Sequence, residues 1–176
     1  MKNKEYISYL NTLHNYNAQN TNSYGEKNVK NNFYKETMVD VLLGGYIVNS
    51  INTSEPHVII LTGHAGDGKT SIMYQVIEQL GQEFDVNKQV KDYQFDNGKK
   101  CRCIKDFSEF SDKDKLRELQ EVMNKPNMGE FAFMVANTGP LINTFGRMFE
   151  KKEKSEEAKI QLIEAMDSNL GQIQNI

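Results

Sequence analysis

The residues best suited to chemistry run from Gly63 to Thr70, which read GHAGDGKT and fit the pattern G-x-x-x-x-G-K-[ST]. This pattern predicts a loop that binds a polyphosphate. A concave row of backbone N–H groups binds phosphate oxygens, and glycine at the tightest points leaves room for their approach. The lysine is expected to reach the β and γ phosphates, and the threonine hydroxyl to ligate Mg²⁺. The candidate binding residues are Gly63, His64, Ala65, Gly66, Asp67, Gly68, Lys69, Thr70 and Ser71.

The flanking segments favour a phosphate-binding loop over a glycine-rich turn that contains Lys-Thr by chance. The run from His57 to Leu61 is short, apolar and β-branched, which is typical of a strand buried in a parallel sheet. After the loop, apolar residues recur at helical spacing as far as Gly81. A helix that starts at the loop contributes amides and its positive dipole end. His64 and Asp67 are expected either to fill turn positions or to touch nucleotide or water.

Hydrolysis requires an acid that holds Mg²⁺ and a group that polarises the attacking water. Asp106 is the candidate acid because it follows the segment 101–105, and Glu109 is the candidate base. The alternative for Asp106 is a solvated loop acid. Arg102 and Lys105 interrupt the preceding segment, whereas a magnesium-directed acid normally follows a central, continuously apolar strand.

Asn137 ends the apolar run 131–136, at the edge where parallel sheets place their ligand sites. A polar side chain there can sense a γ phosphate; the alternative is a turn or helix-cap asparagine ahead of Gly139-Pro140. Arg147 can act across a subunit interface or lie on a surface helix. The predicted catalytic residues are therefore Lys69, Asp106, Glu109 and Asn137, and the predicted metal ligands are Thr70 and Asp106.

The remaining pattern predicts the elements around these residues. A short helix is expected at 1–14, followed by a polar linker, and a second helix at 34–51 that contains Gly44-Gly45. The Asn97-Gly98 turn predicts a β-hairpin between Val90–Phe95 and Cys101–Ile104.

Further along the chain, Ser111 is expected to cap a helix that ends before Lys125-Pro126. The apolar run 131–136 then predicts a second buried strand. Two helices, at 141–152 and 155–168, are expected to follow it.

Composition narrows the possible functions. A chain of 176 residues and 20.2 kDa suits one domain. Its net charge of −3 gives no global basic field, so any DNA contact is expected to be indirect. Cys101 and Cys103 are expected to be reduced strand residues, because no second cysteine pair completes a zinc site. The sequence has no apolar leader and no run long enough to cross a bilayer, so we expect a cytoplasmic protein without membrane contact.

The order of these features resembles P-loop ATPases of the AAA+ or related additional-strand type. More narrowly, LTGHAGDGKTS at 61–71 and ANTGPL at 136–141 resemble the DptF-type ATPases of bacterial phosphorothioation-dependent DNA restriction. The resemblance covers roughly residues 35–150 and implies an α/β three-layer sandwich with a parallel sheet. It also implies ATP and Mg²⁺ as ligands, Asp106 as the Walker B acid and Asn137 as a sensor-1-like asparagine.

With this resemblance, residues 1–33 are expected to form the helix and polar linker, and 34–176 a P-loop domain that is incomplete at its C-terminus. The sequence departs from the family because no adjacent Asp-Glu pair follows an apolar run. ATP hydrolysis is therefore expected to need partner subunits or further chain.

Three functions follow from these residues. The first is the ATPase part of a DNA restriction or phage-defence system, acting with protein partners or by self-association. The second is a nucleotide-dependent signalling switch with little hydrolysis. The third is a small-molecule kinase, which the scattered positions of Arg102, Arg117 and Arg147 disfavour because such enzymes clamp phosphate with clustered lid arginines. The lack of an Asn-Lys-x-Asp element favours ATP over GTP.

Overall fold

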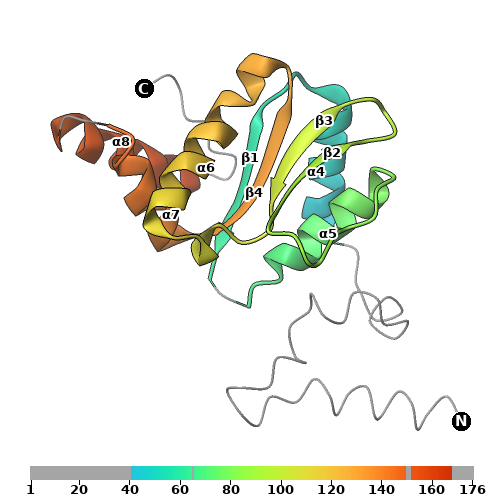
Figure 1. The fold of residues 1–176 in the computed structure, drawn as a ribbon, viewed down its shortest axis with the longest axis horizontal. Helices are drawn as coiled ribbons and strands as arrows, with labels where there is room; N and C mark the ends of the chain where they lie inside the picture. The colour runs from blue at the N-terminus through green and yellow to red at the C-terminus, as the bar shows by residue number, and fades with distance from the viewer. Residues whose placement is uncertain (1–40, 65, 150–151, 168–176) are drawn as a thin grey trace, which may run out of the picture.

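The computed structural model describes residues 41–64, 66–149 and 152–167. The helix expected at 1–14 and the linker after it lie outside the described residues. The elements follow one another as α4 (Leu42–Thr53), β1 (Val58–Gly63), α5 (Lys69–Gln79), β2 (Val90–Gln94), β3 (Lys100–Ile104), η2 (Phe107–Glu109), α6 (Asp112–Asn124), η3 (Pro126–Met128), β4 (Phe131–Asn137), α7 (Thr138–Gly146) and α8 (Lys152–Asp167). Figure 1 shows these helices packed around a twisted sheet.

Within the described residues, the strands form one four-stranded sheet in the order β1-β4-β3-β2. Strands β1, β4 and β3 run parallel, and β2 pairs antiparallel with β3. The register between β1 and β4 sets Val58 against Ala132 and Gly63 against Asn137, so the two strands end side by side. The α/β architecture with a mostly parallel sheet is confirmed.

Helices cover both faces of the sheet, with α4 and α5 on one face and α6 and α7 on the other (Figure 1). Strand β4 shows why, because six of its seven residues are buried and alternate between two cores. Phe131, Phe133 and Val135 pack with α4 and α5, and Ala132, Met134 and Ala136 pack with α6, α7 and α8. This two-sided burial accounts for the unbroken apolar sequence of the strand.

The expected β-hairpin is present and joins the sheet at its edge. Strands β2 and β3 are connected by a tight turn in which Phe95 donates its N–H to the Lys99 carbonyl over 2.9 Å, and Gly98 has φ +80°. The ammonium of Lys99 donates to the carbonyls of Ile51, Asn52 and Ser54 at 2.7, 3.1 and 3.1 Å. A lysine at the last carbonyls of a helix satisfies groups that lack partners in the helix itself. The turn is thereby fixed to the end of α4.

Helix α6 begins and ends where the sequence predicts. The Ser111 hydroxyl accepts the N–H of Asp114 over 3.3 Å as the N-cap, and the helix ends just before Lys125-Pro126. Helix α4, Leu42–Thr53, ends two residues beyond the span of 34–51 expected for it, and residues 34–40 of that span lie outside the described part of the chain. Its Gly44 is buried and lies opposite Gln75 of α5, where an added Cβ would be 3.4 Å from the amide oxygen.

The boundaries predicted for the last two helices are wrong. We expected a turn at 137–140 and a helix at 141–152, but α7 starts at Thr138 and ends at Gly146. Pro140 falls in the first turn, where its missing N–H removes no helical hydrogen bond. At Gly146, the last residue of α7, an added Cβ would be 2.2 Å from the Lys159 side chain of α8, so the missing side chain leaves room for the two helices to pack closely. Helix α8 begins at Lys152 rather than at 155.

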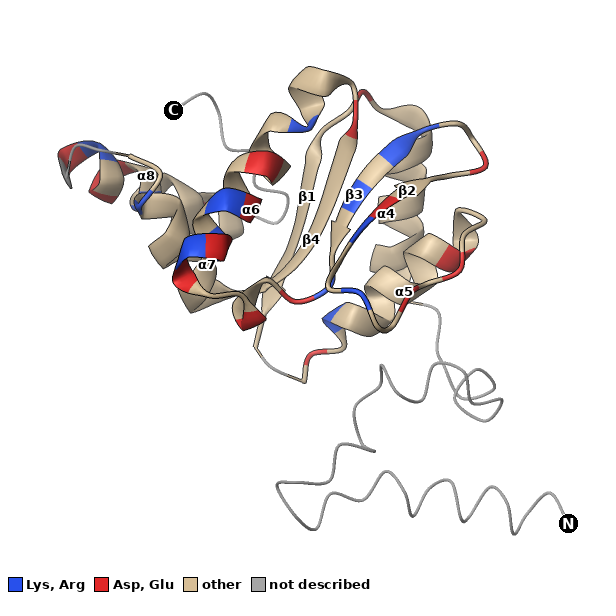
Figure 2. Ribbon diagram, in the orientation of Figure 1, with Lys and Arg blue, Asp and Glu red and all other residues tan. Residues whose placement is uncertain are grey.

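None of the helices in the described ranges combines the length and apolar character that a bilayer crossing requires. Figure 2 shows acidic and basic residues interspersed over strands and helices, in keeping with the small net charge of −3.

Candidate functional site

The glycine-rich loop connects β1 to α5 at the carboxyl end of the parallel strands. Gly66 and Gly68 have φ of +90° and +74°, which other residues rarely adopt, and apart from the chain neighbours no heavy atom of the described residues lies within 4 Å of a Cβ built on either. Helix α5 then starts with no capping side chain and no acidic residue in its first turn. Its positive dipole end therefore faces the loop, where Asp67 is the nearest acidic residue along the chain.

Two side chains close this loop on itself. The ammonium of Lys69, a residue that is only 8% exposed, donates to the His64 carbonyl. The carboxylate of Asp67 accepts the His64 N–H, with 2.5 Å between Oδ2 and N. The same oxygen would lie 2.6 Å from a Cβ at Gly63, so Asp67 occupies the space that the glycine leaves. His64 and Asp67 therefore both take turn positions.

The other loop residues predicted to bind nucleotide lie beside these. Thr70 and Ser71 are half-buried in the first turn of α5. Ala65 lies outside the described residues. Within the loop, Lys69 and Thr70 thus occupy the helix start, where a lysine and a hydroxyl can face bound phosphate and its metal.

Asp106 follows β3 at the same edge of the sheet. Its Oδ1 accepts the N–H of Ser108 over 2.8 Å and so caps the short helix η2. Its carbonyl accepts a hydrogen bond of 2.5 Å from the Gln89 side chain. Asp106 is half-buried rather than solvated, whereas Glu109 at the end of η2 is exposed. Of the two acids, Asp106 is therefore the one held by hydrogen bonds at the end of β3.

Asn137 ends β4, between the loop on β1 and the acid after β3. It is the residue before α7, but its side chain makes no capping hydrogen bond. Its N–H donates to the Ser108 hydroxyl over 3.2 Å. The helix-cap interpretation of this side chain is therefore not supported, and Asn137 lies in register with Gly63.

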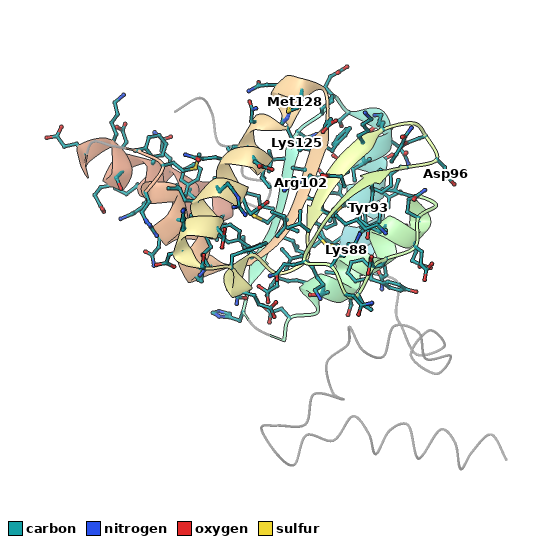
Figure 3. The ribbon with its side chains drawn as sticks, in the orientation of Figure 1. Lys88, Tyr93, Asp96, Arg102, Lys125 and Met128 are labelled. Carbon is teal, nitrogen blue, oxygen red and sulfur yellow. The ribbon has the colours of Figure 1, made fainter. Side chains whose placement is uncertain are left out.

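Arg102 interrupts the apolar character of β3, and its side chain, labelled in Figure 3, forms ion pairs with three acidic residues. Its guanidinium lies 3.2 Å from Asp92, 2.8 Å from Glu118 and 2.9 Å from Glu121. Burial lowers the pKa of Arg102, but the hydrogen bond to Glu118 and the three acidic charges outweigh it and raise the pKa above its ordinary value. Arg102 thus has a structural role in these ion pairs. Strand β3 lies between β4 and β2 in the sheet although it carries this charged residue.

Arg147 and the two cysteines make contacts that are structural. Arg147 caps the end of α7, half-exposed, 3.6 Å from the Asp112 carboxylate. Cys101 and Cys103 are free and buried, with their sulfur atoms 3.8 Å apart. Burial, together with the contact to Cys101, raises the pKa of the Cys103 thiol well above its ordinary value, which keeps it protonated and unreactive.

The sequence pattern missed Ser108 and Gln89. An aspartate two residues before Ser108 is a common turn signal, so the capping bond to Asp106 could have been found. The contact between Ser108 and Asn137 spans 29 positions, and no local pattern encodes it.

The chain matches no known protein-family model, and no curated protein matches it either. Its function must therefore be inferred from the residues and their arrangement.

Proposed function

We propose that this protein is a P-loop NTPase that binds Mg·ATP, with an α/β three-layer fold. The observation that supports this most is the common edge of the sheet. There the loop after β1, Asn137 after β4 and Asp106 after β3 come together at the carboxyl ends of three adjacent parallel strands. Ligands of open parallel sheets bind at this edge.

The residues fit such a ligand. The space beside Gly66 and Gly68, where a Cβ would meet no described heavy atom beyond the chain neighbours, leaves room for a phosphate to approach the loop backbone. The Thr70 hydroxyl and the Asp106 carboxylate are hard oxygen ligands, as Mg²⁺ prefers. No group of three or more His, Cys, Asp or Glu that could hold a metal occurs in the described ranges.

In this proposal, the chain's own residues each have a role. Lys69 exchanges the His64 carbonyl for phosphate oxygens, and Asp106 presents Oδ2, to which no described residue donates a hydrogen bond. Asn137 faces the γ phosphate from the next strand. Bound Mg²⁺ supplies neutralisation of phosphate charge when ATP is cleaved.

A nucleotide-dependent switch with slow hydrolysis is the second candidate. The observation that favours it is the exposure of Glu109, since a base that activates water should be held in the site. Rapid ATP turnover by the 176-residue chain alone would contradict the switch.

The resemblance to DptF-type ATPases supports a place in bacterial DNA restriction, with protein partners supplying the DNA contacts. Under this proposal, duplex DNA and partner subunits raise ATP turnover, measured by phosphate release. Turnover that is absent under every one of these conditions would contradict the ATPase assignment.

Replacing Lys69 with alanine tests nucleotide binding directly. Lys69→Ala should lose Mg·ATP affinity by a factor of about 100 or more, because the mutation removes the charge that faces the β and γ phosphates. Isothermal titration calorimetry measures the affinity, and circular dichroism checks that the fold is kept. The matched control is Lys88→Ala, an exposed lysine in the loop before β2. Equal affinity in the two variants would overturn the site.

The same experiment separates binding from hydrolysis. Asp106→Asn should bind ATP but release no phosphate, since it lacks the charge that holds the metal. Undiminished phosphate release by this variant would place the acid elsewhere.

A further inference from the structure

The turn after β3 carries Asp106 and also Ser108, which contacts the Asp106 carboxylate. The Asp106 carboxylate accepts the Ser108 N–H over 2.8 Å, so the position of the acid depends on where Ser108 lies. Ser108 is half-buried in η2, and this short helix packs against β4 and α7. The backbone of one residue thereby fixes the candidate magnesium ligand.

The side chain of the same residue fixes the neighbouring strand. Pairing between β3 and β4 ends at Ile104 and Met134, whereas β4 continues to Asn137. The Ser108 hydroxyl takes over beyond that point and accepts the Asn137 N–H over 3.2 Å. A strand-end N–H that is partly buried needs such an acceptor. Asn137 in turn lies in register with Gly63, where the phosphate loop begins.

We propose that Ser108 is a positioning residue that sets the Asp106 carboxylate and the Asn137 side chain relative to the phosphate loop. The inference rests on the proposed function, because it concerns the same site. Ser108 touches neither phosphate nor metal in this scheme. It acts through its N–H on the acid and through its hydroxyl on the strand that carries the amide.

The purely structural role would be to satisfy one backbone N–H, and the two roles differ in what they change. A structural role alters stability only. A positioning role changes the rate of hydrolysis and the Mg²⁺ concentration that is required. It leaves the ATP affinity at saturating Mg²⁺ unchanged, because that affinity is set by the loop residues. A displacement of about 1 Å in a catalytic group can cost roughly 100-fold in rate.

The experiment uses the full 176-residue chain with Ser108→Ala and the matched control Ser111→Ala. Ser111 lies three residues further on, and its hydroxyl accepts the Asp114 N–H at the start of α6 instead of a group of the candidate site. We expect Ser108→Ala to bind ATP at saturating Mg²⁺ within about twofold of the wild type. Its kcat should fall by about 10–100-fold, and its half-saturating Mg²⁺ concentration should rise by about tenfold. Ser111→Ala should lose thermal stability and keep both kcat and the Mg²⁺ requirement.

Two further variants keep the test decisive if Ser108→Ala does not fold. Ser108→Thr keeps a hydroxyl acceptor and should retain at least about half of the wild-type kcat, whereas Ser108→Cys keeps the size but offers a weak acceptor and should not. Equal kcat and equal Mg²⁺ requirement in Ser108→Ala, Ser108→Cys and the wild type would overturn the role of Ser108. A wild-type chain that binds no Mg·ATP would instead overturn the proposed function. If the wild type binds ATP without cleaving it, the Mg²⁺ requirement for binding decides the role of Ser108.

Discussion

Asp67 places a negative charge inside the loop that is proposed to bind a polyanion. Its carboxylate accepts the His64 N–H, which is the kind of backbone group that would otherwise be offered to phosphate. Lys69 is also occupied, by the His64 carbonyl. The loop thus holds two internal contacts, with which a nucleotide bound as proposed would compete.

Replacing Asp67 with asparagine should tighten ATP binding. The substitution removes a charge that repels the phosphates, which is worth about 1 kcal/mol at a solvated site, or roughly fivefold in affinity. Calorimetric titration with Mg·ATP measures the change.

Glu78→Gln is the matched control for Asp67→Asn, because it makes the same charge change at an exposed position near the far end of α5. It should leave the affinity unaltered, since charges in water beyond about 10 Å are screened. Weaker binding by Asp67→Asn would mean that the carboxylate supports the bound form of the loop instead.

At the residue scale, the sequence is informative where one local pattern holds all the groups. The octapeptide at 63–70 specifies its glycines, lysine and hydroxyl together, and the structure puts them between a strand and a helix as predicted. The contact between Ser108 and Asn137 could not be found in this way, because the two residues are 29 positions apart in the chain. Such contacts depend on which strands become neighbours.

At the scale of elements, β3 and α6 are joined through Arg102. Glu118 is 6% exposed at its side chain and Glu121 is 49% exposed, although both contact the same guanidinium. One nitrogen of Arg102, Nε, is buried and without a hydrogen-bond partner in the described part of the chain. The arginine therefore depends on its remaining contacts.

Glu118→Gln should lower the free energy of unfolding by about 2–3 kcal/mol, because a buried charge loses its best-shielded partner. Glu121→Gln should cost less than about 1 kcal/mol, as exposed ion pairs do. Urea denaturation followed by circular dichroism gives both values. A larger loss in Glu121→Gln than in Glu118→Gln would contradict the ranking by burial.

The boundaries of helices and strands could be predicted where a local residue pattern, such as a cap, a turn or an apolar run, marks them. Ser111 caps α6, Asn97-Gly98 makes the hairpin turn, and the apolar run at 131–136 becomes a strand buried on both faces. Helix α7 was misplaced because Gly139-Pro140 is typical of a turn, and only packing decides that it forms the first helical turn instead. The close approach of Gly146 to the Lys159 side chain of α8 likewise has no local signal in the sequence.

At the scale of the whole molecule, β2 depends on a buried phenol. Tyr93 is 5% exposed, and its hydroxyl accepts the Asp85 N–H over 3.2 Å. Burial raises the pKa of Tyr93 to about 12. The folded protein therefore keeps this proton at pH values where the unfolded chain loses it, so the stabilising contribution is present below pH 10 and is lost as the pH rises towards 12.

Tyr93→Phe should therefore change how stability depends on alkaline pH. At neutral pH the variant loses one hydrogen bond, worth about 1 kcal/mol. Between about pH 9 and pH 11, the wild type should lose about 1 kcal/mol more than the variant, because only the wild type has this phenol to ionise on unfolding. Urea denaturation at several pH values measures the difference. Parallel stability curves for the two proteins would contradict the raised pKa.

The fold class followed from the sequence, but the strand order did not. Alternating apolar strands and amphipathic helices predict an α/β sheet with helices on both faces. Nothing local shows that β4 inserts between β1 and β3, yet this order is what brings Asn137 between the loop and Asp106.

Because β1, β3 and β4 are parallel, their carboxyl ends lie at one rim of the sheet and their amino ends at the opposite rim. Met128, which is 62% exposed, comes shortly before β4 and lies at the rim formed by the amino ends of the strands. The hairpin turn at Asp96, which comes before β3, lies at the same rim (Figure 3). A tether or dye attached through a cysteine at position 128 would leave the glycine loop open to solvent. Immobilised in that orientation, the protein offers its proposed nucleotide face to whatever flows past it.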